Sequence, residues 1–424
     1  MKKPFTVMIG ALQPTKYNQK GFSNLNYSIL PLEFELPEQG LVFDLEELFE
    51  ILCLLEDKRS KRGRRYLLAL LLLIALLAKL AGQNQIRGIA HWAKLRRREL
   101  GNLFGLVNPQ MPHHVTWSRI LGKGVDPQMF SRLVGQFLGK AVQGPGQIPE
   151  RGSLLLAIDG KTLRGTIPLG KTRGTHLVAA YLPGSGVVLA QIAVETKENE
   201  IVVAPKVLAQ LDLRGMVVVG DAMYCQRELS ARVVEGGGDY LWVTKENQKG
   251  ILEDIEILFG EAVVPKGCFS PEPTDFEEYE ERGKGHGREE HRVITSSSML
   301  ANYTPWPHLA QVFKLESWRW DKLGRESHQV RYGVTSLPRE VANPKRLMGL
   351  LRGEWGIENG LHYRRDVTFG EDHSQLRQGK APEVNAILNN LAVGLLVQQG
   401  VTNVAEARRE FDYHFSKKLV GRLL

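Results

Sequence analysis

Two apolar runs that each end in an aspartate decide the fold of this chain. They read LLLAID at residues 154–159 and MVVVGD at residues 216–221. Each run is short and continuous, which is typical of a buried strand. Between them, HLVAAYL (176–182) and GVVLAQIAV (186–194) flank a Pro-Gly-Ser-Gly turn and predict a hairpin, and residues 200–211 predict an amphipathic helix. Strands that alternate with helices after an opening hairpin indicate a mixed α/β sheet.

The remaining sequence divides the chain into regions around this sheet. From Leu41 to about Phe137, apolar residues recur at three- and four-residue spacing and predict a small all-helical domain. Within the α/β part, an acid-rich stretch breaks the alternation and predicts an insertion that is part strand and part loop. The expected regions are a loose arm at 1–40, the helical domain at 41–145, the α/β domain at 153–400 with its insertion at about 249–327, and a tail at 401–424.

Composition limits the class of protein. The chain has 424 residues and a formal net charge of +8, from 55 Lys and Arg against 47 Asp and Glu. Such a modest basic excess permits a polyanionic partner. Cys53, Cys225 and Cys268 form no C-x-x-C pair, which argues against a disulfide framework or a structural zinc site. We therefore expect a reducing, cytoplasmic environment.

One apolar run raises the question of a membrane. Residues 67–78 read LLALLLLIALLA, and Lys79 then interrupts the run. A bilayer span needs about 20 apolar residues. The run therefore predicts a buried core helix, and we expect neither a membrane span nor a targeting segment.

The strand-end aspartates are the first candidates for chemistry. Functional groups of an open α/β sheet gather beyond the carboxyl ends of its strands, where Asp159 and Asp221 are expected. Two carboxylates brought together there repel each other unless a cation lies between them, and such oxygen-rich sites suit Mg²⁺ or Mn²⁺. A strand-terminal aspartate is also a common turn residue or helix N-cap, so both interpretations stay open.

A charged segment near the C-terminus supplies further candidates. In EWGIENGLHYRRDVTFGEDHSQLR (354–377), helical spacing i, i+4, i+7 places Glu358, His362 and Arg365 on one face. Asp366, Glu371 and Asp372 lie nearby. An ordinary charged amphipathic helix explains the same pattern.

Residues Gly165–Thr172 read GTIPLGKT and match the phosphate-binding motif G-x-x-x-x-G-K-[ST]. A phosphate-binding loop needs a helix N-terminus directly after it. Here the following residues alternate like a strand, so a P-loop ATPase is the weaker interpretation and a solvated turn the stronger.

Basic residues gather in the helical domain. Seven of them are candidates for contact with a polyanionic partner: Lys94, Arg96, Arg97, Arg98, Arg59, Arg62 and Arg65. A solvated helix face is the competing explanation.

Five segments carry a family resemblance. In chain order they read AIDGKTLRGT (157–166), HLVAAYLPGSGVVLAQIAVETKENEI (176–201), VVVGDAMYCQREL (217–229), YLWVTKENQ (240–248) and WGIENGLHYRRDVTFGEDHSQLR (355–377). Together they resemble the motifs of bacterial insertion-sequence DDE transposases, in the ISAs-type, H-repeat-associated branch. IAHWAK and PHHVTWSRIL (112–121) also resemble the helical N-terminal domain of that branch. The resemblance covers roughly residues 40–400.

The resemblance implies a ribonuclease-H-like mixed-sheet catalytic core with a β-rich insertion before its last helix. It implies that Asp159, Asp221 and Glu358 are a metal-binding catalytic triad, with Arg365, Asn359 and Lys161 in support. Two Mg²⁺ or Mn²⁺ ions in such a site can activate a nucleophile and stabilise the leaving oxygen of a phosphodiester. Water as nucleophile cleaves DNA, and a freed 3′-hydroxyl joins the element to target DNA.

Two departures from the family pattern stand close to the triad. Glu354 occupies a position where relatives usually carry histidine or arginine, and Tyr224-Cys225 replaces a more usual His-Thr pair. The resemblance also implies double-stranded DNA as partner, at element ends and target, a homo-oligomer on DNA, and association with the bacterial nucleoid. A catalytically inactive DNA-binding relative stays open as an alternative.

Overall fold

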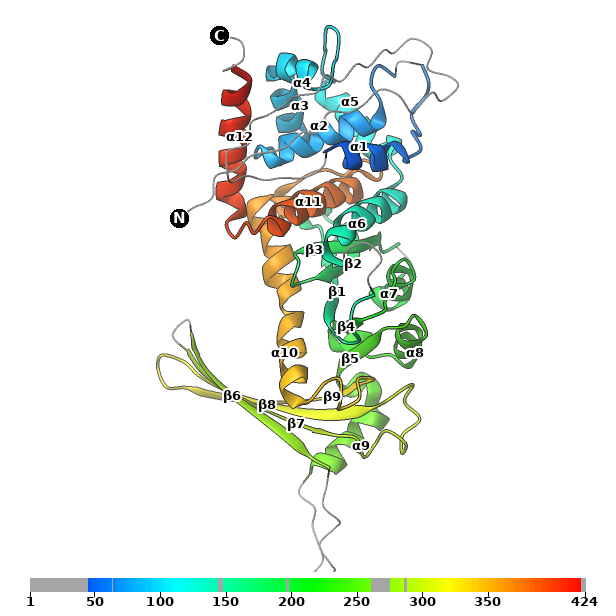
Figure 1. Cartoon of the computed structure of the whole chain (residues 1–424), viewed down its shortest axis with the longest axis vertical. Coiled ribbons are helices and arrows are strands. Elements are labelled where there is room, and N and C mark those ends of the chain that lie inside the picture. Colours follow the sequence, from blue (N-terminus) through cyan, green and yellow to red (C-terminus); the bar gives the residue numbers. More distant parts are fainter. Residues whose placement is uncertain are drawn as a thin grey trace, which may run out of the picture.

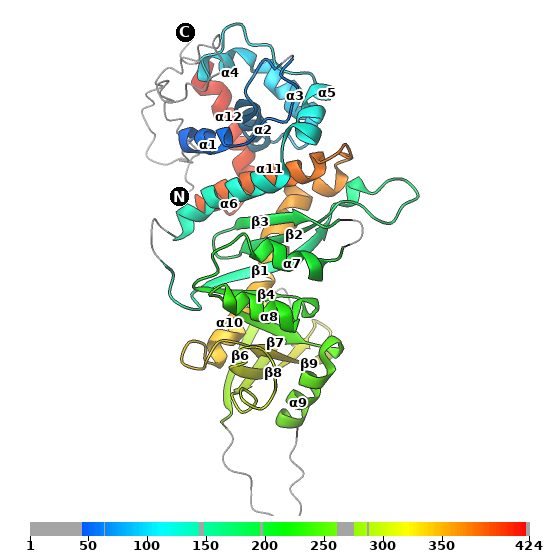
Figure 2. The ribbon, with the colours of Figure 1, turned by 90° about the vertical axis from the view of Figure 1, so that its right-hand side faces the viewer.

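The structure is a computed structural model that describes residues 45–62, 64–143, 148–195, 198–260, 275–285 and 288–420. The expected arm at 1–40 and Cys268 lie outside these residues. A helical region forms one end of the molecule, one continuous sheet begins in its middle, and the antiparallel part of that sheet forms the other end (Figures 1 and 2).

The helical region is built around one completely buried helix. All 13 residues of α2 (Leu68–Leu80) are buried, as the unbroken apolar run predicts. Within the described residues, no helix is both long and apolar enough to span a bilayer. The other helices of the N-terminal half are α1 (Leu45–Cys53), α3 (Ile86–Leu95), α4 (Arg97–Leu103), α5 (His114–Arg119) and α6 (Pro127–Gln143).

The C-terminal segment is part of this helical region, and the expectation of a tail was wrong. Helix α12 (Val404–Val420) and helix α11 (Ala381–Gln398) both pack against α2 (Figure 1). The indole of Trp92 donates a 3.1 Å hydrogen bond to Asp412, and its ring lies 5.4 Å from that of Phe415. The helical unit therefore uses both halves of the chain.

The sheet has nine strands in the order β3-β2-β1-β4-β5-β9-β8-β7-β6. Strands β1, β4 and β5 run parallel, and every other neighbouring pair is antiparallel. The first five strands form the mixed sheet of a ribonuclease-H-like core, which confirms the expected fold class. Their bounds are β1 Leu154–Thr162, β2 His176–Leu182, β3 Val187–Ala193, β4 Met216–Gly220 and β5 Asp239–Thr244.

The insertion extends this sheet with four antiparallel strands. After helix α9 (Lys249–Phe259), the strands are β6 Glu277–Gly285, β7 Arg288–Ser297, β8 Gln311–Trp320 and β9 Glu326–Thr335. Strand β9 pairs with β5, so the insertion joins the core edge to edge. It contains more strand than the sequence suggested.

Alternating side chains divide the central sheet into two buried faces. One face packs against α7 (Glu200–Leu208) and α8 (Arg227–Glu235), and includes Leu156 and Ile158. The opposite face includes Ala157 and packs against α10 (Pro344–Glu354) (Figure 2). Helix α10 therefore lies on the face towards which odd-numbered residues of β1 point.

Candidate active site

Asp159 and Asp221 are neighbours because of strand register. Strands β1 and β4 run parallel, and Ile158 is paired with Gly220. The next residues along the two strands are Asp159 and Asp221. Adjacent strands lie about 4.8 Å apart, so the two aspartates leave the same edge of the sheet side by side. Alternation turns Asp159 to the side of Ala157, which is the α10 face.

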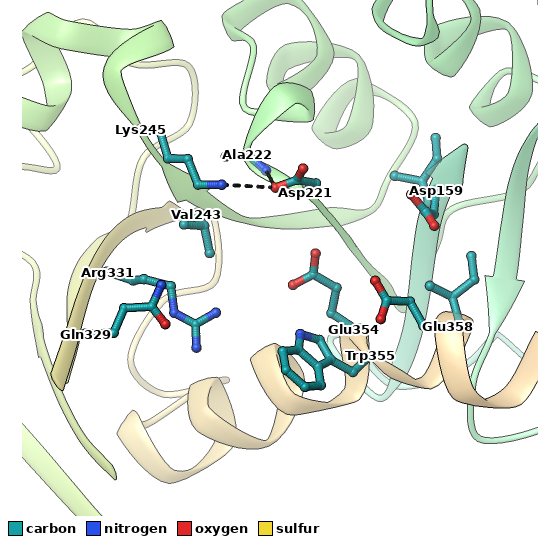
Figure 3. A pocket seen from close by; sticks show the side chains of 12 residues that line it. Asp159, Asp221, Ala222, Val243, Lys245, Gln329, Arg331, Glu354, Trp355 and Glu358 are labelled. Atoms are coloured by element: carbon teal, nitrogen blue, oxygen red, sulfur yellow. Dashed lines mark hydrogen bonds and ion pairs between the residues drawn. The ribbon is translucent and has the colours of Figure 1, made fainter. Parts of the chain in front are cut away.

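A third carboxylate comes from the segment that continues α10. Beyond Glu354 the helix widens: the Tyr363 N–H bonds to the Glu358 carbonyl, five residues back, in the pattern of a π-helix. Glu358 begins this widened turn and faces the two aspartates (Figure 3).

All three acids line one pocket of about 310 Å³. Glu354 lines the same pocket, so four carboxylates from three elements share it. The opposite wall carries Lys245, which follows β5, and Gln329 and Arg331 of β9 (Figure 3). The insertion therefore completes a pocket that the core strands begin.

The pocket concentrates negative charge. Burial raises the pKa of Asp159 to about 6, and the charges of Glu200, Glu358 and Asp221 add to this, against a backbone hydrogen bond from Gly160. Burial also raises the pKa of Glu354 to about 7, helped by Asp221, Asp159 and Glu358 and opposed by Arg331. Such mutual repulsion is the electrostatic signature of a site that attracts cations.

Among the described residues, no three acidic, histidine or cysteine side chains stand close enough to form a ready-made metal site. The Asp221 carboxylate accepts a 2.6 Å hydrogen bond from the Ala222 N–H and lies 3.5 Å from the Lys245 ammonium. The donor set nevertheless fits a divalent cation, since all candidate ligands are carboxylate oxygens that carry excess charge.

A partly buried hydrogen-bond network lies next to the aspartates on the other face of the sheet. The carboxylate of Glu200, the first residue of α7, accepts hydrogen bonds from His176 Nε2 at 2.8 Å and from the Tyr224 hydroxyl. The Thr162 hydroxyl bonds to His176 Nδ1 at 2.7 Å. A side chain at Gly160 would meet the Glu200 carboxyl group at 2.2 Å, so that carboxyl group rests on the backbone beside Asp159.

Sequence reasoning missed this network. Glu200 looks like an ordinary acid in the first turn of a helix, and only the cross-strand pairing of Thr162 with His176 reveals its neighbours. Tyr224 stood out only as a departure from the family pattern. The Glu200 partners lower its pKa although burial acts in the opposite direction.

The expected supporting residues lie away from the carboxylate pocket. Arg365 is fully buried and pairs with Glu371 at 2.7 Å, and also contacts Gln191 of β3. The widened helix explains this position, because spacing i, i+4, i+7 defines one face only at 3.6 residues per turn. Lys161 is buried against Asp366 at 2.6 Å.

Two further residues of this segment also differ from expectation. Asn359 is exposed and does not line the pocket. His362 Nδ1 lies 3.5 Å from Asp159, but burial, together with Arg365 and Lys161, lowers its pKa to about 3. The imidazole is therefore neutral at physiological pH, and this contact is not an ion pair.

The match to a phosphate-binding loop has no structural counterpart. Residues 164–166 form a single 3₁₀ turn, and the chain then passes through turns into strand β2. No helix begins directly after Thr172, so the backbone N–H groups and helix dipole that hold phosphate are missing from this described segment.

The basic residues of the helical region divide into two groups. Lys94, Arg97, Arg98, Arg62 and Arg65 are exposed. Arg96 instead pairs with Asp412 at 2.7 Å and lies 5.0 Å from the Trp92 ring, and Arg59 pairs with Asp57 at 2.7 Å. These two arginines neutralise acids within the fold, which leaves five exposed candidates for DNA.

A ribonuclease-H-like sheet with acids at the carboxyl edge of β1 and β4 defines the class of this protein, and comparisons with known proteins identify the family. The family described as Transposase DDE domain matches residues 150–395, and one described as DDE_Tnp_1-associated matches residues 49–138. The chain belongs to the transposase DDE domain family, and it is a transposase, an enzyme that acts on DNA.

Two relatives from Escherichia coli agree with this assignment. YncI of Escherichia coli O157:H7, named as a candidate transposase, is 28% identical over 360 residues, which is 83% of this chain and 87% of that protein. YhhI of E. coli K12, named as an H repeat-associated candidate transposase, is 30% identical over 60% of this chain and 67% of its own length. The solved synaptic complex of piggyBac transposase with hairpin DNA aligns with 89% of this chain and 79% of its own, at 11% identity and a TM-score of 0.41.

Proposed function

We propose that Asp159, Asp221 and Glu358 are the catalytic triad of this transposase. One observation carries the proposal: acids from β1, from the end of β4 and from the helix after α10 line a single pocket. The triad would hold Mg²⁺ or Mn²⁺, with two ions in the full site. Bound ions supply activation of the attacking oxygen and stabilisation of the leaving oxygen in an in-line displacement.

The residues of the chain contribute position and charge. Asp159 and Asp221 present neighbouring carboxylates from a rigid sheet edge, and Glu358 faces them across the pocket. Lys245 lies 3.5 Å from Asp221, so its ammonium neutralises part of the acidic charge in the free enzyme. The reactions assigned to this pocket are cleavage of a DNA strand by water and joining of a 3′-hydroxyl to target DNA.

We further assign DNA recognition to the helical region. Its exposed basic residues Lys94, Arg97, Arg98, Arg62 and Arg65 can contact phosphates at the ends of the element. Carboxylates that hold metal carry no sequence information, so a second region must choose the site. The same proposal includes a homo-oligomer on DNA and association with the nucleoid.

Isosteric variants test the triad. Asp159→Asn and Glu358→Gln should abolish strand cleavage of element-end DNA in Mg²⁺ or Mn²⁺ and leave DNA binding little changed, because phosphate contacts come from Lys and Arg. Glu340→Gln, at an exposed acid just before α10, is the matched control and should cleave normally. Unchanged cleavage by a purified triad variant would refute the assignment.

A further inference from the structure

The wall of the pocket opposite the carboxylates is formed by the insertion. Arg331 of β9 extends across the pocket towards Glu354 (Figure 3). Gln329, two residues earlier on the same strand, lines the pocket with it. Residues two apart on a strand share a face, so this face of the insertion sheet is turned towards the acids.

Strand register adds two more arginines to this face. Arg331 is paired with Leu315 of β8, and Arg292 of β7 is paired with Ser317. Leu315, Ser317 and Arg319 alternate along β8 and therefore point to the same side. Arg331, Arg319 and Arg292, here called the arginine face, thus come from three adjacent strands. The Arg319 guanidinium lies 5.9 Å from the ring of Trp355, another residue that lines the pocket.

The arginines of this face differ in their ion pairs. Glu281 of β6 is in register with Arg292 and lies on the same face, but it pairs with Arg352 of α10. Glu290 is shared by Arg292 and Arg319, the latter at 3.6 Å. Arg331 forms no ion pair with any described residue, and its buried Nε has no hydrogen-bond acceptor there. Burial lowers the pKa of Arg331, and the charges of Arg319 and Arg292 act in the same direction against that of Glu354.

On the opposite face of the same strands, two cations are paired with neighbouring acids. Arg282 of β6 pairs with Glu280 at 2.7 Å, and Lys314 of β8 pairs with Glu316 at 2.9 Å. Lys314 and Trp318 are even-numbered residues of β8, so they point away from the arginine face. Arg282 points to the same side as Trp318, because it is in register with His291, which is in register with Trp318. Arg331, which forms no ion pair with any described residue, therefore lies on the pocket side of the insertion.

We propose that the arginine face binds the phosphate backbone of the DNA strand that enters the carboxylate pocket. This inference rests on the proposed function, since it assigns the DNA contacts next to the site of cleavage. Guanidinium groups suit phosphate because their donors match two phosphate oxygens at once. Three adjacent β-strands span about 10 Å. One strand of a DNA duplex carries about three phosphates over that length of helix axis, at about 3.4 Å per phosphate.

Binding without divalent metal tests the arginine face separately from catalysis. The probes are a labelled random-sequence duplex and the matching single strand, with affinity followed by fluorescence anisotropy in EDTA at several salt concentrations. For the duplex, log affinity falls with log salt, and each phosphate contact adds about 0.9 to the steepness of this slope. The slope of the full-length variant R292Q/R319Q/R331Q should therefore be shallower than that of the wild type by up to about 2.7. R331Q alone should lose about 0.9.

The control variant R282Q/K314Q removes two charges from the opposite face of the same sheet, and its slope should equal that of the wild type. Thermal unfolding of each variant shows whether it folds, and R331Q serves if the triple variant does not. An R331Q slope equal to that of the wild type for both probes would overturn the proposal. An arginine-dependent slope together with normal cleavage by Asp159→Asn would instead contradict the catalytic triad, so the two failures are distinguishable.

Discussion

Glu200 joins the two strand ends that carry Asp159 and Asp221. Its carboxylate accepts a hydrogen bond from His176, which is paired across the strands with Thr162. It also accepts a hydrogen bond from the hydroxyl of Tyr224, three residues after Asp221. The same carboxyl group packs on the backbone of Gly160, where any other residue would collide with it. Glu200 thus contacts residues close to both aspartates, although it does not itself line the pocket.

We therefore expect Glu200→Ala to impair the pocket without removing a pocket residue. His176 and Tyr224 would lose their hydrogen-bond acceptor, and a hydrogen bond to a charged group contributes about 1.5–3 kcal/mol to the stability of a fold. Cleavage should need a higher metal concentration for half-maximal rate, and Glu200→Gln, which keeps one acceptor oxygen, should recover part of the loss. Glu198→Ala, two residues earlier and paired with Lys206, is the control. An unchanged metal requirement in Glu200→Ala would contradict this role.

The sequence predicted those elements whose pattern is set by burial alone. Strands β1 and β4 are continuous apolar runs that end in acids, and α2 is apolar on every side. The same elements place Asp159 and Asp221 at one edge, so this half of the candidate site follows from pattern and register. The position of Arg365 did not follow, because the widened turn after α10 has no signal in helical spacing.

Elements with one polar face were harder to predict. Strand β6 reads EEYEERGKG and resembles a loop until β7 pairs with it. Helix α12 has few apolar residues and was predicted as a tail, yet Phe411 and Ala407 are buried against the helical region. The packing partners of α12 include α2 and Trp92, which lie far away in the sequence, so no local pattern reveals the position of this helix.

Helices α3 and α4 carry the exposed basic residues whose role in DNA binding can be measured. Lys94, Arg97 and Arg98 changed together to Ala should flatten the salt dependence of binding to element-end DNA, by about 0.9 in log–log slope for each lost contact. Arg232→Ala, an exposed arginine of α8 that pairs with Glu228, is the control. An unchanged slope in the triple variant would assign recognition to another surface.

At the scale of the molecule, a buried polar network ties the helical region to the sheet. Arg365 donates hydrogen bonds to Gln191 of β3 and to Glu371. Asn389 of α11 also bonds to Glu371, and it accepts a 2.7 Å hydrogen bond from Lys79 of α2. Lys79 is fully buried. The two regions are therefore joined by charged and amide groups as well as by apolar packing.

Lys79 makes the stability of the fold depend on pH. Burial lowers its pKa to about 7, and Arg408 adds to this against Glu371. A lysine in the unfolded chain has a pKa of about 10.4. Between about pH 7 and 10, Lys79 is therefore mostly protonated in the unfolded chain and mostly neutral in the folded one. The contribution of Lys79 therefore becomes more favourable as pH rises through this range, by at most about 1.4 kcal/mol per pH unit.

Urea unfolding at pH 7, 8 and 9 measures this contribution as a difference between two proteins. Lys79→Met should be more stable than the wild type at pH 7, and this advantage should shrink towards pH 9, because other titrating groups are common to both. Lys140→Met, at an exposed lysine paired with Glu47, should keep the pH dependence of the wild type. Parallel curves for Lys79→Met and the wild type would show that Lys79 keeps its proton in the fold.

The central claim is that Asp159, Asp221 and Glu358 converge on shared metal ions. Anomalous diffraction from crystals of the full chain with Mn²⁺ and DNA tests it most directly. The account predicts an anomalous peak in the carboxylate pocket, with oxygens of all three residues within about 2.0–2.6 Å of the bound ions. Mn²⁺ held elsewhere, or any one of the three carboxylates more than about 10 Å from the other two, would contradict it, because a shared ion needs bonds of only ~2–2.5 Å.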